Sequence, residues 1–404
     1  MRKSNKQAEK LWTKDFILVS LINFLLTLIF YLLIVIIAVY STDKFQASVS
    51  QAGLVTGIFI IGTLLGRLFI GRVIDDIGRK KTLFIGLTAF VFTTLLYFVS
   101  FTLPLLLLIR FLHGVSLGIA STATGTIVAQ IIPDRKKAEG IGYYSMSAAL
   151  ATAIGPFTGL FMMQHTNFEL IFLLCTLLSV VCFSVAFLVD VPALRILNTS
   201  TKEKKFSLAD FVEPKALPIA LVAFIVALCY SSVLSFINSY AIEINLVSTA
   251  SFFFIVYAVA VLVSRPFTGQ LLDIKGANYV MYPAFVFFVI GLITLSFTHS
   301  SFSLLLSGVF IGLGFGNLQS STQAIAIKLT EPHRMGLATS TFFIFLDGGL
   351  GFGPYLLGFV IPIIGFRKLY IILGFVVLLT ALIYHFLHGK HSLKIVSSIS
   401  KNNA

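Results

Sequence analysis

Long apolar runs recur along the whole chain and limit the folds that are open to it. A helix needs about 20 apolar residues to cross the hydrocarbon core of a bilayer. The mean hydropathy of +0.99 is too high for a soluble domain. We therefore predict an all-α membrane protein with twelve transmembrane helices. The expected spans are 16–40, 51–71, 82–100, 104–131, 140–164, 170–189, 218–240, 248–271, 280–297, 301–326, 337–360 and 369–387.

Lysine and arginine are concentrated in alternate loops. Of the 29 such residues, 23 fall in the two terminal segments and every second loop. Cytoplasmic loops of membrane proteins carry this excess, so we expect a multi-pass protein of the cell membrane with both termini in the cytoplasm. The net charge of +13 then needs no nucleic-acid partner, because no basic face interleaved with aromatic residues is visible.

The chain has an internal duplication on either side of its longest polar interruption, residues 190–217. A shift of 198 residues aligns Arg67 with Arg265, Asp75 with Asp273 and Pro156 with Pro354. Two copies in the same orientation predict two six-helix bundles related by pseudo-twofold symmetry along the membrane normal, with a substrate site between them. The expected parts are a cytoplasmic tail (1–14), a first bundle (15–189), a cytoplasmic central loop (190–217), a second bundle (218–388) and a second cytoplasmic tail (389–404).

Four short motifs resemble those of the major facilitator superfamily. Residues 71–82 read GRVIDDIGRKKT, which resembles the signature loop of that family, and residues 269–278 are similar to a weakened copy. The fourth span carries Arg110 followed by HGVSLG, similar to the second motif. The GPFTG sequence at 155–159 resembles the motif of the drug/proton antiporter branch, and GPYLLG at 353–358 repeats it.

The resemblance implies a cytoplasmic gate around the signature loop. The carboxylate of Asp75 would accept hydrogen bonds from backbone N–H groups near Gly336, where the helix dipole favours an anion by about 0.3–1 kcal/mol. Asp76 stands where the family usually has a cation, so either carboxylate could dock. Alternatively, the cations only fix the topology. The candidate gate residues are Gly71, Asp75, Gly78, Arg79, Lys80 and Asp273.

Charged residues inside a span are costly, so they are normally paired or line a wet cavity. Asp347, Arg110 and His113 are therefore candidates for proton coupling. A carboxylate whose surroundings change between two states can bind a proton in one and release it in the other. The alternatives are that Asp347 only bonds a neighbouring helix and that His113 is a hydrogen-bonding cavity residue.

Two further groups of residues follow from the resemblance. The antiporter-like motif would shape contacts and hinges, or else serve ordinary helix packing, through Gly155, Pro156, Gly159, Gly353 and Pro354. The substrate cavity is expected to contain Asn23, Tyr31, Asn238, Asn317 and Gln323. Because these side chains are neutral, an amphipathic or weakly cationic small molecule fits best.

We predict a secondary active transporter that exports a small molecule in exchange for protons and acts as a monomer in the bilayer. The alternative is a proton-linked uptake symporter for a small metabolite. An intramembrane enzyme is disfavoured because Asp347 has no second carboxylate inside a span. A non-transporting sensor would normally carry a sizeable soluble domain. No cofactor and no metal are expected, since the three cysteines lack a ligand spacing.

Overall fold

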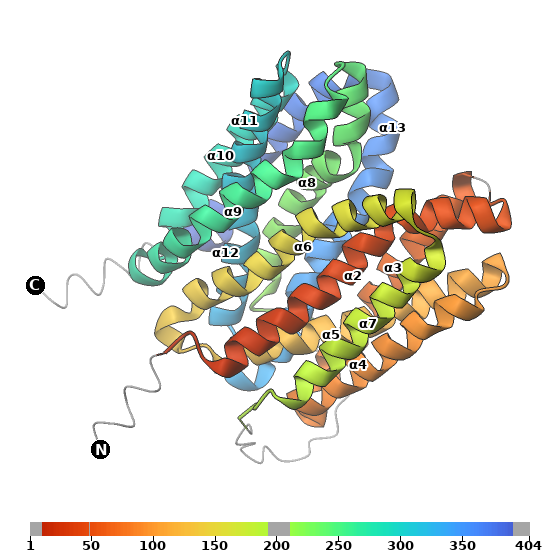
Figure 1. Ribbon diagram of the computed structural model, residues 1–404. Helices are drawn as coiled ribbons and strands as arrows, with labels where there is room; N and C mark the ends of the chain where they lie inside the picture. The colour runs from red at the N-terminus through yellow and green to blue at the C-terminus, as the bar shows by residue number, and fades with distance from the viewer. Residues whose placement is uncertain (1–9, 48, 193–210, 391–404) are drawn as a thin grey trace, which may run out of the picture. The chain divides into compact units, whose positions relative to one another are not determined.

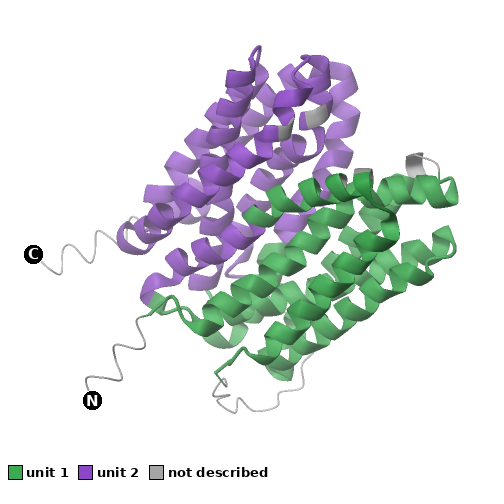
Figure 2. Ribbon diagram, in the orientation of Figure 1, with its two compact units in different colours: residues 1–134, 150–213, 330–344 green, residues 135–149, 214–329, 345–404 purple. Residues whose placement is uncertain are grey.

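The computed structural model describes residues 10–47, 49–192 and 211–390, and every element in these ranges is helical (Figure 1). Eleven helices in the described residues are long and apolar enough to cross a membrane. The chain divides into two compact units (Figure 2). Unit 1 comprises residues 1–134, 150–213 and 330–344, and unit 2 comprises residues 135–149, 214–329 and 345–404.

Unit 1 is a bundle in which α5 packs against three other helices, α2, α3 and α4, while α7 packs against α2 and α4. Its α-helices are α2 (Lys14–Phe45), α3 (Val49–Ile77), α4 (Arg79–Leu95), α5 (Leu103–Ile131) and α7 (Phe168–Phe187). A short turn, η1 (Leu96–Val99), extends α4.

Glycines bring α3 and α5 into direct backbone contact. A Cβ at Gly62 or Gly66 would overlap the backbone of α5, and a Cβ at Gly114 or Gly118 would overlap the backbone of α3. Small residues allow such close approach between membrane helices, where packing replaces the hydrophobic effect as the main driving force. These two helices therefore form a fixed framework for unit 1.

Unit 2 contains a second bundle with an irregular helix. Its elements are α8 (Leu217–Glu243), α9 (Val247–Lys275), α10 (Asn278–Ser296), α11 (Ser301–Ile311), η4 (Gly312–Gly316) and α12 (Asn317–Lys328). The segment η4 is a π-helical turn that joins α11 to α12. A Cβ at Gly314 would overlap the backbone of Phe288 in α10, so this turn also depends on glycine for a close contact.

Two helices change unit along their length. In α6 (Lys137–His165), which follows η2 (Asp134–Lys136), residues up to 149 group with unit 2 and later residues with unit 1. In α13 (Met335–Tyr384), which follows η5 (Pro332–Arg334), residues up to 344 group with unit 1 and later residues with unit 2. Residues 135–149 therefore group with unit 2, and residues 330–344 with unit 1.

The two last predicted spans, 337–360 and 369–387, both fall in α13 and the turn η6 (His385–Gly389) that follows it. Gly365 interrupts α13 with φ 75° and ψ 166°, so two helices are joined at this residue. A positive φ of this size is readily adopted by glycine only. The eleven apolar helices therefore contain a break between the eleventh and twelfth predicted spans.

Candidate functional site

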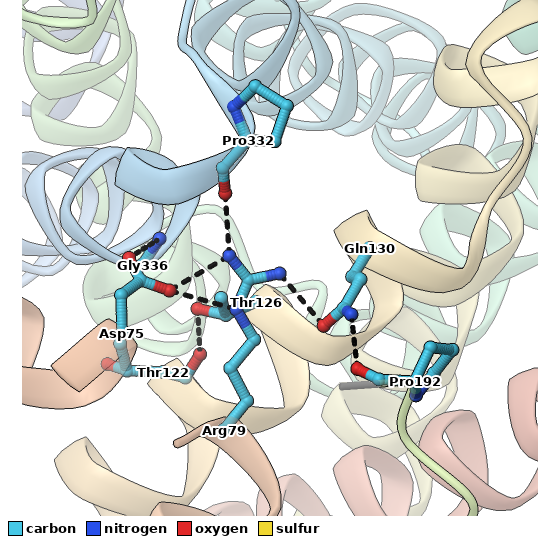
Figure 3. A network of polar contacts seen from close by, with 8 residues as sticks. All are labelled: Asp75, Arg79, Thr122, Thr126, Gln130, Pro192, Pro332 and Gly336. Atoms are coloured by element: carbon cyan, nitrogen blue, oxygen red, sulfur yellow. Dashed lines mark hydrogen bonds and ion pairs between the residues drawn. The ribbon is translucent and has the colours of Figure 1, made fainter. Parts of the chain in front are cut away.

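A polar cluster in unit 1 joins the ends of α3 and α5 to the start of α13 (Figure 3). Asp75 accepts from the backbone N–H of Gly336 at 3.2 Å and from Nε of Arg79 at 2.9 Å. Arg79 also donates to the side-chain oxygen of Gln130 at 2.9 Å and to the carbonyl of Pro332 at 2.8 Å. We call these five residues the Asp75 cluster.

Glycines set the geometry of this cluster. Gly78, with φ 97°, separates α3 from α4 and places Asp75 and Arg79 on either side of the turn. A Cβ at Gly336 would lie 2.2 Å from Cγ2 of Ile74 and 2.9 Å from an Asp75 carboxylate oxygen, so a glycine at this position leaves room for α3 and its carboxylate to approach the amide. About two turns before Gly78, Gly71 lies against the side chain of Ser340, whose hydroxyl donates to a backbone carbonyl of α3.

The charges in the Asp75 cluster are nearly enclosed. The side chain of Arg79 is only 1% exposed, and that of Asp75 is 17% exposed. Lys80 differs from Arg79, because it lies 3.8 Å from Asp190 and both side chains are open to solvent. Exposed pairs of this kind contribute little to stability. Asp76 is exposed, so Asp75 is the carboxylate that docks.

A second cluster, in which a carboxylate also accepts from the first turn of a helix, lies in unit 2. Asp273 accepts from the backbone N–H groups of Ala138 and Glu139, at 3.0 and 2.8 Å, which belong to the first turn of α6. Lys328 donates to the same carboxylate at 2.5 Å. Gly276, with φ 94°, ends α9 just after Asp273. We call Asp273, Ala138, Glu139 and Lys328 the Asp273 cluster.

A buried arginine marks the middle of unit 1. Arg110 in α5 donates to the carbonyl of Val55 and to the hydroxyl of Tyr97, both at 3.2 Å, and lies over the ring of Phe59 at 4.4 Å. The Tyr97 hydroxyl is also 3.0 Å from Nδ1 of His113. Within the described residues, Nη2 of Arg110 and Nε2 of His113 are buried and have no hydrogen-bond partner.

These contacts define how Arg110 and His113 are held. The hydroxyl of Tyr97 has one hydrogen, so if it accepts from Arg110 it can donate to Nδ1 of His113. His113 is then neutral, with its proton on Nε2. The unused donor of Arg110 favours the binding of a negative or polar group, since an unpaired buried donor costs about 1–3 kcal/mol.

The other predicted coupling residue, Asp347, is half-buried in the part of α13 that belongs to unit 2. Arg110 belongs to unit 1. Coupling between the two residues stays a prediction.

The predicted cavity residues have different surroundings. The side chain of Asn317 donates to Ser264 and the Leu313 carbonyl and accepts from Thr268. Gln323 is buried, and among the described residues its Nε2 has no partner. Asn23 is buried in α2, Tyr31 lies in the same helix against Gly155, and the side chain of Asn238 lies outside the described residues.

The antiporter-like motifs make helix contacts inside each unit. In unit 1, Gly155 and Gly159 of α6 lie against Tyr31 and Leu32 of α2. In unit 2, Gly353 of α13 lies against Ser231 of α8. Both motif prolines, Pro156 and Pro354, lie inside their helices.

Several residues of these clusters have little recognisable signal in the sequence. No motif contains Tyr97, Gln130 or Lys328. Their partners His113, Arg79 and Asp273 are 16, 51 and 55 residues away in the chain. The only sequence signal for Gln130 is that it is a polar residue near the end of an apolar span. The described residues also contain no group of three or more His, Cys, Asp or Glu side chains that could hold a metal.

The fold and the clusters define a helical protein with many membrane spans. A family model described as Major Facilitator Superfamily matches residues 19–277 and 247–401, so the chain belongs to this family and is a multi-pass membrane transporter.

The staphylopine export protein of Staphylococcus aureus is 22% identical over 88% of this chain and 92% of its own length. The multidrug resistance protein MdtG of Escherichia fergusonii is 23% identical over 81% of this chain and 82% of its own length. The crystal structure of FucP, a transporter of the same family in an outward conformation, superposes with a TM-score of 0.75 at 16% identity, covering 94% of this chain and 99% of FucP.

Proposed function

We propose that this protein exports a small amphipathic or weakly cationic molecule across the cell membrane in exchange for protons. A central site would open to either side of the membrane in turn. The observation that carries this proposal is the pair of carboxylate clusters, in which Asp75 and Asp273 each accept from the first turn of a helix distant in sequence. Such contacts can form in one conformation and break in another.

The capping contacts of the Asp75 and Asp273 clusters, which form the proposed gate, are weak enough to form and break reversibly. A carboxylate at a helix start gains from the helix dipole and from unsatisfied backbone donors, typically about 0.5–2 kcal/mol for a capping contact. Two such contacts bias a conformational equilibrium without locking it. A transporter needs this range, because both conformations must be populated during each cycle.

The topology proposed for this function has twelve helices in two bundles, with both chain ends in the cytoplasm. The break at Gly365 supports two spans within α13. The concentration of Lys and Arg in alternate loops supports the orientation. The gate clusters, which lie at loops on the basic side, would then close the cytoplasmic entrance.

Export and proton coupling are supported by separate observations. Two relatives are named for multidrug resistance and for the export of staphylopine, which favours export over uptake. His113 and the half-buried Asp347 are side chains that could bind and release a proton, and the unused donor of Arg110 could bind a polar group of the transported molecule. The neutral side chains among the cavity candidates favour an amphipathic ligand over a multiply charged one.

Everted membrane vesicles that contain the protein test this proposal. We expect acid-inside vesicles to accumulate a cationic amphipathic dye such as ethidium, and a fluorescent pH indicator to report proton release when the dye is added. Vesicles with the Asp347→Asn variant are the matched control. Accumulation only in right-side-out vesicles, together with proton entry, would identify an uptake symporter instead. The absence of any proton-linked flux across a panel of amphipathic cations and small metabolites would contradict the proposal.

A further inference from the structure

We propose that Glu213, at the end of the central loop, is a positioning residue of the gate that holds the start of α13 where Asp75 can cap it. The role in a gate rests on the proposed function. The contact between Glu213 and the start of α13 can be tested without measuring transport. The inference assigns a role to the central loop, which joins the two halves of the chain and contains none of the sequence motifs.

The buried carboxylate of Glu213 forms an ion pair with a partly exposed arginine in the turn that precedes α13. Its carboxylate lies 2.5 Å from Nε of Arg334, and the Glu213 side chain is 3% exposed while that of Arg334 is 38% exposed. The backbone N–H of Glu213 donates to the hydroxyl of Thr341 at 2.8 Å. Glu213 therefore contacts Arg334 before Gly336 and Thr341 after it, and Gly336 is the residue that Asp75 caps.

The burial of Glu213 makes this contact sensitive to conformation. A carboxylate removed from water is unfavourable unless it is paired and hydrogen-bonded. If the start of α13 moves away from the loop, Glu213 loses Arg334 and must reach water. The pair therefore favours the arrangement in which the start of α13 lies against the loop.

The same loop is attached to the Asp75 cluster at its other end. Nε2 of Gln130 donates to the carbonyl of Pro192 at 2.7 Å, while the oxygen of the Gln130 side chain accepts from Arg79 (Figure 3). Arg79 in turn donates to the carbonyl of Pro332, two residues before Arg334. The described residues at both ends of the central loop are thus bonded into one network with the gate.

An aromatic contact holds the loop against α3. The guanidinium of Arg72 lies over the ring of Phe211 at 4.9 Å, and Phe69 contacts the same ring edge-on at 6.5 Å. Phe211 is two residues before Glu213. This contact holds the loop against α3, the helix that carries Asp75. Glu213 therefore lies beside the helix that supplies the cap.

Hydrogen–deuterium exchange on the purified full-length protein tests this role. We expect Glu213→Gln to speed amide exchange in residues 335–341 by at least about tenfold, because the start of α13 opens more often when its buried partner is uncharged. Exchange in the middle of α5 is expected to stay unchanged. Glu331→Gln is the matched control, since that carboxylate is 56% exposed and close to the same turn.

A double-mutant cycle separates positioning from general loss of structure. Arg334→Gln should accelerate exchange in residues 335–341 at least as much as Glu213→Gln does, because it leaves the buried carboxylate unpaired, and the double variant should be no worse than Arg334→Gln alone. If Glu213→Gln fails to fold, Arg334→Gln tests the same pair from its exposed partner.

Unchanged exchange in Arg334→Gln, or additive effects in the double variant, would overturn the inference. Exchange is measured without substrate, so a failure of proton-coupled transport would refute the proposed function and leave this result standing.

Discussion

Asp75 and Asp273 are 198 residues apart, and they accept hydrogen bonds from Gly336 and Ala138, which are also 198 residues apart. The two contacts are therefore exact counterparts under the internal duplication. In each case the carboxylate comes from one copy and the amide from the other. A duplicated sequence has produced two reciprocal caps, each on the first turn of the corresponding helix.

Removing the charge of Asp75 should weaken the first cap. Asp75→Asn leaves the buried Arg79 without its carboxylate, a loss of about 1–3 kcal/mol from the conformation that contains this contact. We expect vesicle transport to fall several-fold while the amount of protein in the membrane is unchanged. Asp76→Asn is the control, because Asp76 is exposed. Equal transport by wild type and Asp75→Asn would contradict a role for this cap.

Removing the charge of Asp273 should weaken the second cap. Asp273→Asn affects two backbone donors and Lys328 at once, so we expect faster amide exchange in residues 138–142. Lys328→Gln should have a smaller effect, because the Lys328 side chain is 32% exposed and both backbone donors keep their acceptor. An Asp273→Asn variant with unaltered exchange in this segment would show that the contact does not stabilise the start of α6.

The hydroxyl of Tyr97 should matter for the stability of unit 1. Tyr97→Phe removes the acceptor for Arg110 and the partner of His113, and it leaves a buried donor unsatisfied at a cost of about 1–3 kcal/mol. We expect a lower apparent melting temperature in detergent. Tyr355→Phe, at a position 67% exposed, should leave the melting temperature unchanged. A Tyr97→Phe protein as stable as wild type would mean that the bridge contributes little.

A methyl group at Gly155 should disturb the contact between α6 and α2. The added Cβ of Gly155→Ala would lie 2.6 Å from the Cβ of Tyr31 and 3.0 Å from the backbone nitrogen of Leu32. Overpacking of this kind typically costs about 1–3 kcal/mol, which thermal unfolding can measure. Gly358→Ala adds the same group where no atom lies within 4 Å, and it should be tolerated. Equal stability of the two variants would argue against a tight contact here.

Neutralising Asp347 should uncouple flux from the proton gradient. An amide cannot bind and release a proton at this position, so Asp347→Asn should still equilibrate substrate but not concentrate it under an imposed pH step. The measurement is accumulation in everted vesicles at two pH gradients. Glu243→Gln, an exposed carboxylate at the end of α8, is the control. Undiminished concentration by the Asp347→Asn protein would place the proton site elsewhere.

The identity of the docking carboxylate could not be read from the sequence. Asp75 and Asp76 are adjacent and chemically equivalent, and only the direction in which α3 presents them decides that Asp75 faces Gly336 while Asp76 faces solvent. Lys80 and Arg79 show the same effect, since one is exposed and the other almost fully enclosed. Rotation about a helix axis by one residue changes the surroundings completely.

By itself, the sequence determined that the chain is helical, that it crosses the membrane many times and that it is duplicated. The bilayer imposes these features locally, because every span must be apolar and must satisfy its own backbone hydrogen bonds. Only the tertiary structure decided which polar residues act together. Glu213 and Arg334 are 121 residues apart, and Asp75 and Gly336 are 261 apart, so their pairing depends on packing between helices that no local pattern encodes.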